Sequence, residues 1–134
     1  RRVSEGDGSV CILAVGRMLE FAEQAAGDLA ETGVRATVWD VRSCAPLDDD
    51  MLADAARHRA VVTIEDGVRE GGVGMTICDR VTALDPRTCV DPMGIPSRFV
   101  PHGEPMQILS RLGLDAPAIV ERARQLLATA DATS

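Results

Sequence analysis

The sequence predicts an α/β fold, a three-layer sandwich built around a mostly parallel sheet. Short aliphatic runs typical of buried strands alternate with longer segments whose apolar residues recur at helical spacing. Hydrophobic residues make up 46% of the chain but aromatic residues only 2%, so the core has to be aliphatic. Because 134 residues suit a single domain, we expect one domain at 9–130, a linker or tail at 1–8 and a frayed tail at 131–134.

Four segments have the composition of buried strands. Each is rich in Val, Ile, Leu, Ala or Cys. The clearest is VCILAVG, an unbroken apolar run closed by a glycine. In chain order the predicted strands are 10–16, 35–41, 60–66 and 88–95.

The segments between these strands have helical patterns. Gly33 suits the end of the first helix, and Asp48 and Asp115 can cap the second and the last. Pro117 fits the first turn of that last helix. The predicted helices are 18–33, 49–59, 71–85, 103–113 and 115–130. The alternation of strands and helices predicts parallel pairing, because parallel strands need crossover connections.

The charge of the chain argues against two classes of partner. The formal net charge is −7, from 21 acidic and 14 basic residues. Nucleic acids and anionic membrane surfaces attract basic proteins, so we expect neither as a partner. No apolar run approaches the ~20 residues of a membrane span. No signal peptide is visible, so we expect a cytoplasmic protein, and the lack of an initiator Met fits a fragment of a longer chain.

The cysteines do not indicate a metal site. Cys11, Cys44, Cys78 and Cys89 include no C-x-x-C pair, and the chain has only two histidines. Cys11 and Cys89 lie in predicted strands and Cys78 in a predicted helix, so we expect these three to be buried, reduced thiols. We expect Cys44 to be exposed.

In open α/β sheets, ligands gather beyond the carboxyl ends of the strands. The first such end, AVGRML, has a single glycine and lacks G-x-G-x-x-G, so it is weak evidence for a phosphate site. At the second end stands Arg42, which could clamp a phosphate or carboxylate with two hydrogen bonds. Arg42 could equally form an ion pair with Asp40 or with one of Asp48–Asp50. Spacing alone leaves both interpretations open.

The third strand leads into the glycine-rich stretch TIEDGVREGGVGM at 63–75. Its glycines match no nucleotide-binding pattern, no Lys is present, and Glu65 and Asp66 would repel an anion. We therefore interpret the glycines as allowing a helix to begin tight against a neighbour. Glu65 could be a functional acid or a structural partner of nearby arginines.

After the fourth strand, the rigid segment GIPSRFVPHGEP contains His102. This residue could act as a base at a ligand site, but such a histidine is more often a satisfied turn residue. No Ser–His–Asp or Cys–His set can be assembled, so we assign no catalytic residue and no metal ligand. The chain looks like a domain that contributes to a site built mainly elsewhere.

Several motifs together resemble a known family. They are R-x-x-x-P-L-D at 42–48, E-[DE]-x-x-x-x-G-G-x-G at 65–74 and G-[ILV]-P-x-x-F-[IV]-x-x-G at 94–103, which L-G-L-D follows. With the strand VCILAVG before them, they resemble the C-terminal domain of transketolase-like enzymes, most of all the 1-deoxy-D-xylulose-5-phosphate synthases. The resemblance covers 9–128, and the motifs are specific in combination although each is weak alone.

The resemblance implies a transferase of which this chain is one part. The parent enzyme would bind thiamine diphosphate and a divalent metal, usually Mg²⁺, with two upstream domains of the same chain. It would decarboxylate pyruvate and join the two-carbon unit to glyceraldehyde 3-phosphate, in a homodimer. The product would feed isoprenoid, thiamine and pyridoxal phosphate synthesis. The fragment alone would bind no cofactor and would be inactive.

The resemblance also implies roles for individual residues. Arg42 matches the arginine that helps to hold the phosphate of the aldehyde. Glu65 and the glycine loop match a segment packed near a domain junction, and we place His102 with them. The loop glycines concerned are Gly71, Gly72 and Gly74.

Four positions depart from the family pattern, and these departures leave the substrate open. Ser43 and Ala45 stand where relatives often carry an aromatic or aliphatic residue and a Lys, Gly67 replaces Asn or His, and Ser97 replaces Asp. The alternatives are a transketolase proper, a 2-oxo-acid dehydrogenase β subunit, or a non-catalytic dimerisation module.

Overall fold

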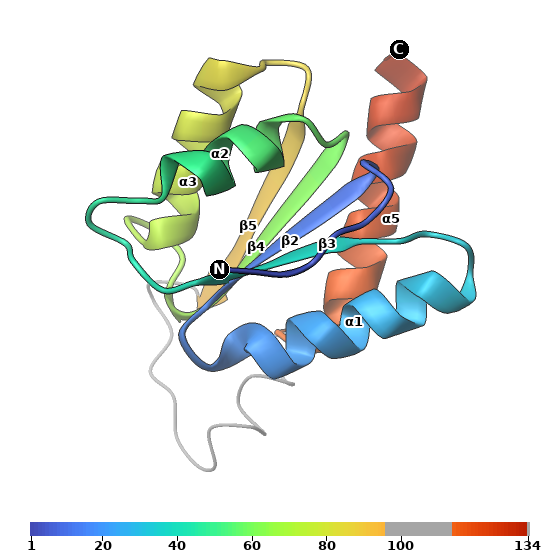
Figure 1. Cartoon of the computed structure of the whole chain (residues 1–134), viewed down its shortest axis with the longest axis horizontal. Coiled ribbons are helices and arrows are strands. Elements are labelled where there is room, and N and C mark those ends of the chain that lie inside the picture. Colours follow the sequence, from blue (N-terminus) through green and yellow to red (C-terminus); the bar gives the residue numbers. More distant parts are fainter. Residues whose placement is uncertain (96–113, 134) are drawn as a thin grey trace.

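A computed structural model describes residues 1–95 and 114–133, except for the side chains of Val68 and Thr133. The described residues form a five-stranded sheet in the order β1-β3-β2-β4-β5 (Figure 1). Its strands are β1 (Arg2–Ser4), β2 (Val10–Val15), β3 (Thr37–Val41), β4 (Ala60–Val68) and β5 (Cys89–Ile95). The helical elements are the 3₁₀ turn η1 (Gly16–Met18), α1 (Leu19–Glu31), α2 (Asp49–Ala56), α3 (Val73–Leu84) and α5 (Ala116–Thr133).

The helices cover both faces of the sheet, which confirms the predicted three-layer sandwich. Helices α1 and α5 pack together on one face, and α2 and α3 pack together on the other (Figure 1). Strands β2 to β5 pair in parallel, whereas β1 pairs antiparallel with β3. Among the described helices, none is both long and apolar enough to cross a membrane.

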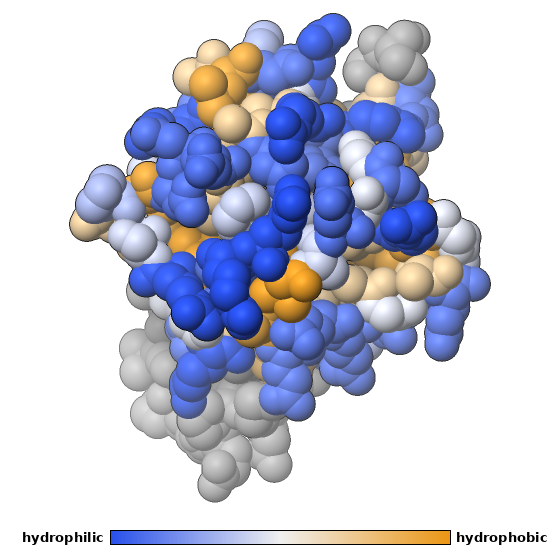
Figure 2. Space-filling model, viewed as in Figure 1, coloured by the Kyte–Doolittle hydropathy of each residue, from blue (hydrophilic) through white to orange (hydrophobic). Residues whose placement is uncertain are grey.

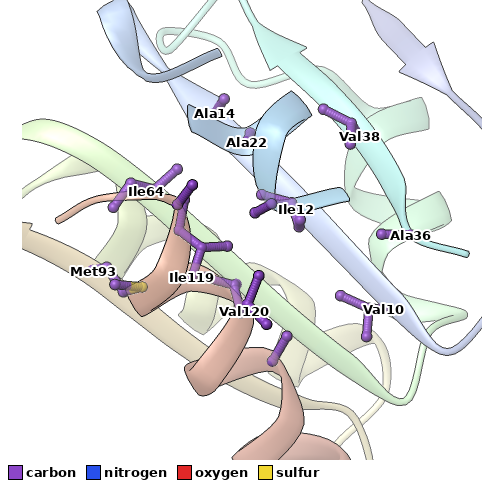
Figure 3. Packing of buried hydrophobic residues seen from close by; sticks show 14 of the residues in the cluster. Val10, Ile12, Ala14, Ala22, Ala36, Val38, Ile64, Met93, Ile119 and Val120 are labelled. Atoms are coloured by element: carbon purple, nitrogen blue, oxygen red, sulfur yellow. The ribbon is translucent and has the colours of Figure 1, made fainter. Parts of the chain in front are cut away.

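The central strand β2 supplies side chains to both cores because its residues alternate between the two faces. Val10, Ile12 and Ala14 belong, together with Ile119 of α5, to the core beneath α1 and α5 (Figure 3). Cys11 and Leu13 belong to the core beneath α2 and α3. All five are fully buried. A strand enclosed on both faces explains why VCILAV reads as an unbroken apolar run.

Buried polar side chains form a connected network under the C-terminal end of α2. Asp54 accepts hydrogen bonds from Trp39 Nε1 at 2.8 Å and from Arg57 Nη2 at 2.6 Å. His58 Nδ1 lies 2.7 Å from the Asp54 carbonyl oxygen, and its Nε2 lies 2.9 Å from the Thr37 hydroxyl. These partners favour the tautomer in which Nδ1 donates and Nε2 accepts. The network joins α2 to β3.

The stretch 1–8, expected to be a linker or tail, contains the short strand β1. Residues Arg2 and Ser4 pair with Trp39 and Val38 of β3. Gly6 N donates to the Thr37 hydroxyl at 2.9 Å, and a Cβ at Gly6 would lie 2.0 Å from a backbone oxygen of Arg35. Three residues with a single apolar side chain give no periodic signal, and the strand is held by its pairing with the edge of β3 and by Val3, which packs against the core.

At the other end, α5 continues to Thr133, into the stretch 131–134 that was expected to fray. The remaining predicted elements in the described residues are present, with bounds that differ by a few residues. The predicted helix at 103–113 lies outside the described residues. The domain limits 9 and 130 remain a prediction. On the face that Figure 2 shows, hydrophilic side chains cover most of the surface and hydrophobic ones form small separate areas.

Candidate functional site

The carboxyl ends of the parallel strands form the edge of the sheet where ligands of such folds bind. From β2 the chain passes through α1 to β3, and from β3 it passes through α2 to β4 on the other side of β2. The connections therefore change direction between β2 and β4 (Figure 1). Arg17 follows β2, Arg42 follows β3, and Glu65 and Asp66 lie near the end of β4.

An ion pair spans the switch point between β2 and β4. Arg17 Nε donates to Asp66 Oδ2 at 3.1 Å, and the Arg17 side chain is 73% exposed. Gly16 makes room for this pair: it has a φ of 69°, and a Cβ there would lie 2.8 Å from Asp66 Oδ1. The sequence analysis dismissed the AVGRML turn and missed Arg17. The sequence feature that could have indicated Arg17 is its position directly after Gly16, the glycine that closes the predicted strand.

Arg42 forms the ion pair that was one of its two predicted interpretations. Its Nε donates to Asp40 Oδ2 at 3.0 Å. The Arg42 side chain is 63% exposed, whereas that of Asp40 is only 16% exposed. Contact through Nε holds the guanidinium in one orientation and leaves both Nη groups outside this pair. The ion pair is therefore compatible with a second, oxyanion partner.

Glu65 adopts a role that the sequence analysis did not consider. Its carboxylate accepts hydrogen bonds from the backbone N–H groups of Val73, at 3.3 Å, and Gly74, at 3.0 Å. Glu65 is buried and caps the N-terminus of α3, where a negative charge is favoured by the helix dipole. In the described residues Glu65 is therefore neither a free acid nor paired with an arginine, the two roles that the sequence suggested. Because the carboxylate occupies this helix terminus, a phosphate is excluded there.

The glycine loop brings α3 close to the sheet. Gly71 has a φ of 77°, and Gly72 is the extended N-cap residue of α3. A Cβ on Gly74 would lie 2.5 Å from the Thr63 hydroxyl and 3.0 Å from Pro92 Cβ. The glycines thus permit the close backbone approach that the sequence predicted. Their role at a domain junction stays a prediction, and His102 lies outside the described residues.

The cysteines only partly match expectation. All four are free thiols; Cys11 is buried and Cys44 exposed, as predicted, but Cys78 and Cys89 are only half-buried. Burial raises the pKa of the Cys11 thiol well above its usual value, so it stays protonated. Across residues 1–95 and 114–133, no three His, Cys, Asp or Glu side chains gather as metal ligands would.

A hollow of about 650 Å³ lies at the opposite edge of the sheet, between the turns that precede β4 and β5. It is lined by Arg57, Arg59 and Arg87, and each of them pairs with an aspartate. Hydrogen bonds from Arg87 hold the pKa of Asp85 below its ordinary value. Helix C-termini, which repel anions, also face this edge. We therefore place the candidate site at the carboxyl edge.

The sequence matches a known domain family. Residues 1–119 match the family described as transketolase, C-terminal domain. The chain is 40% identical over 119 residues to the 1-deoxy-D-xylulose-5-phosphate synthase of Arthrobacter sp. (strain FB24), which covers 89% of this chain and 18% of that protein. It is 38% identical over 120 residues to 1-deoxy-D-xylulose-5-phosphate synthase 2 of Kitasatospora griseola, covering 90% and 19%. The chain thus spans about a fifth of the length of these curated relatives.

Solved structures show the same architecture. A split-gene transketolase, described as an inactive β4 tetramer, is similar with a TM-score of 0.85 and 31% identity, covering 96% of this chain and 42% of that one. The transketolase of Campylobacter jejuni gives a TM-score of 0.66 at 16% identity, covering 90% and 17%. At 16% identity, the similarity to the Campylobacter jejuni transketolase concerns the fold alone.

Proposed function

The chain belongs to the transketolase C-terminal domain family, and we propose that it is the C-terminal domain of a 1-deoxy-D-xylulose-5-phosphate synthase. The observation that carries this proposal is the identity of 34–42% to several proteins of that name. The three motifs at 42–48, 65–74 and 94–103 support the same assignment. The whole enzyme would condense pyruvate with glyceraldehyde 3-phosphate and release CO₂.

The chemistry of decarboxylation would come from thiamine diphosphate, which such an enzyme binds together with Mg²⁺. The described residues do not fit either group. No cluster of metal-ligating side chains is found among them, and Glu65 already occupies the N-terminus of α3. We therefore assign the cofactor and the metal to upstream domains of the same chain, and expect the isolated fragment to be inactive.

Within this proposal Arg42 holds the phosphate of the aldehyde. Its guanidinium is exposed at the carboxyl edge of the sheet and is oriented through Nε by Asp40. The two Nη groups form the planar fork that matches a phosphoryl or carboxylate group. Glu65 and the glycine loop, with His102, would hold the domain against its neighbours. The enzyme would be a cytoplasmic homodimer, where the four cysteines stay reduced.

Replacing Arg42 in the intact enzyme tests this assignment. We expect Arg42→Ala to raise KM for glyceraldehyde 3-phosphate about tenfold or more, because a charged hydrogen bond to the phosphate is lost. KM for pyruvate should stay unchanged. Steady-state kinetics with each substrate varied in turn measures both values. An unchanged KM for the aldehyde would remove Arg42 from the site.

A second candidate is a subunit of a split transketolase-like enzyme. The similarity to the split-gene transketolase favours it, because that protein is described as the product of a split gene. The intact mass of the native polypeptide separates the two, since a product near 14.2 kDa would indicate a separate subunit or dimerisation module.

Substrate profiling of the intact enzyme then distinguishes the synthase from a transketolase or a 2-oxo-acid dehydrogenase. CO₂ release from pyruvate that glyceraldehyde 3-phosphate stimulates would identify the synthase.

A further inference from the structure

Arg17 and Arg42 share the same geometry at the ends of neighbouring strands. Each guanidinium is bound through Nε to one aspartate oxygen, Arg17 to Asp66 at 3.1 Å and Arg42 to Asp40 at 3.0 Å. Each aspartate is the less exposed partner: the Asp66 side chain is 28% exposed and that of Asp40 16%. In each arginine the aspartate holds the Nε atom in place, and these contacts do not use the two Nη groups.

The strand register brings the two arginines to the same edge. Val15 at the end of β2 lies opposite Val41 at the end of β3. Gly16 and Arg42 follow these two residues, and Arg17 is one residue further along. Neighbouring strands are ~4.8 Å apart, so both long side chains start within reach of one small ligand. Arg17 also borders the topological switch point between β2 and β4, and Arg42 lies one strand away at the same carboxyl edge, where ligands of this class of sheet bind.

The surroundings at this edge favour an anion. The turn η1 and helix α1 begin beside Arg17, and their N-cap residues Val15 and Met18 make no side-chain cap hydrogen bond. The carboxylate of Glu65, in contrast, occupies the N-terminus of α3. The start of α1 therefore adds a positive contribution next to Arg17, which the acidic Glu20 in its first turn partly offsets. The negative charges of Asp66 and Asp40 are directed at the Nε side of each guanidinium.

Stability alone does not account for the pair at Arg17. Its side chain is 73% exposed, and exposed ion pairs contribute little to folding. Yet a glycine with positive φ is placed at Gly16, where a side chain would collide with Asp66. The local backbone is thus built to keep Asp66 against Arg17, which orients that guanidinium.

We propose that Arg17 is a second contact for the phosphoryl group that Arg42 binds, and that Asp66 and Asp40 position the two guanidiniums. This inference rests on the proposed function, because it assigns both arginines to the same phosphorylated substrate. The ligand is the phosphoryl group of a small phosphate ester held between two guanidinium forks.

The test compares Arg17→Ala with Arg42→Ala in the intact enzyme. We expect each to raise KM for glyceraldehyde 3-phosphate about tenfold and to leave KM for pyruvate unchanged. Titration calorimetry with glycerol 3-phosphate, which carries the same phosphoryl group but is not turned over, should show the same loss of affinity. Asp66→Asn should weaken binding less, because Arg17 is then present but less well oriented.

Arg87→Ala is the matched control. Arg87 also pairs with an aspartate through Nε, at 3.1 Å from Asp85 Oδ1, but lies at the opposite edge of the sheet. This variant should change neither KM nor phosphate affinity, and all variants should keep the thermal midpoint of the wild type.

Each failure has a separate meaning. If Arg42→Ala weakens binding and Arg17→Ala does not, the second contact is disproved while the proposed function stands. If Arg17→Ala raises KM for pyruvate instead, Arg17 faces a carboxylate and the phosphoryl assignment is wrong. If neither variant changes either KM, both the inference and the proposed role of Arg42 fail.

Discussion

The two faces of the sheet are packed in different ways. Beneath α1 and α5 the described core is aliphatic, with Ala, Val, Ile, Leu and Met side chains (Figure 3). Beneath α2 and α3 the core also holds polar side chains that are less than 9% exposed. They are Thr37, Asp54, His58, Thr63, Glu65 and Thr88.

The two faces therefore contribute differently: the aliphatic face mainly stabilises the fold, and the polar face mainly fixes the positions of the helices. Aliphatic contacts stabilise roughly in proportion to buried area and do not depend on direction. Buried polar groups need partners in defined positions, so they fix where elements lie. Glu65 fixes the start of α3, and the network of Asp54 and His58 fixes α2 on β3. Glu65 therefore sets the geometry of the carboxyl edge from this face, whereas the network of Asp54 and His58 holds the opposite edge, where His58 lines the hollow.

The largest expected effect is on the aliphatic face. Ile119 of α5 is fully buried in that core, so Ile119→Ala should lower the free energy of unfolding by about 2–5 kcal/mol. No titratable group is removed, so the loss should be equal at pH 7 and pH 5. Urea denaturation at both pH values measures it. A loss below about 1 kcal/mol would mean that α5 packs less tightly than the buried surface indicates.

On the polar face, Asp54→Asn should cost about 1–3 kcal/mol at pH 7, because charged hydrogen bonds to Arg57 and Trp39 are weakened. Burial acts to raise the pKa of Asp54, but the hydrogen bonds from Arg57 and Trp39 outweigh it and leave this pKa below its ordinary value. A carboxylate with a lowered folded-state pKa stabilises the fold above its unfolded-state pKa of ~3.9, and this contribution disappears as the pH falls through the folded value.

The difference between wild type and Asp54→Asn should therefore be constant from pH 7 to pH 5 and shrink below about pH 4. Denaturation curves at pH 7, 5 and 3.5 give this comparison. A difference that does not change with pH would show that the charge of Asp54 is not what stabilises the network.

Substituting a glycine in each of two helices should change the stability in opposite directions. Gly74→Ala in α3 should destabilise by about 1–3 kcal/mol, because its Cβ would meet the Thr63 hydroxyl at 2.5 Å. Gly27→Ala in α1 should stabilise by about 0.5–1 kcal/mol, because nothing lies within 4 Å of that Cβ and alanine favours the helix. Thermal unfolding compares the two variants.

Adding Thr63→Ala to Gly74→Ala should recover part of the loss, since it removes the nearest contact. If Gly74→Ala were as well tolerated as Gly27→Ala, α3 would not begin tight against β4. The glycine loop would then have no packing role in this domain.

Much of the fold could be predicted because its signals are local. Continuous aliphatic runs marked the four parallel strands, and helical spacing marked α1, α2, α3 and α5. Asp48 accepts from the N–H groups of Asp50 and Met51, and Asp115 accepts from Ala118, as expected of N-caps. The strand β1 could not be predicted, because its three residues are too few for a periodic signal and are held by contacts distant in sequence, the edge of β3 and the core that Val3 packs against.

The site was less predictable. Arg42 was identified from its place after a strand, but spacing did not decide between an ion pair and a ligand contact. Arg17 was missed because its partner Asp66 is 49 residues away. The cap made by Glu65 was missed because its partner Gly74, nine residues on, is reached only when the glycine loop folds back.

The sequence by itself determined the four parallel strands and the described helices α1, α2, α3 and α5, because composition and periodicity depend only on neighbours along the chain. It also carried the family, through motifs that lie in single segments. Only the tertiary structure decided which charges meet at the carboxyl edge. Those contacts depend on strand order, and β2 between β3 and β4 is what places Arg17 beside Asp66 and near Arg42.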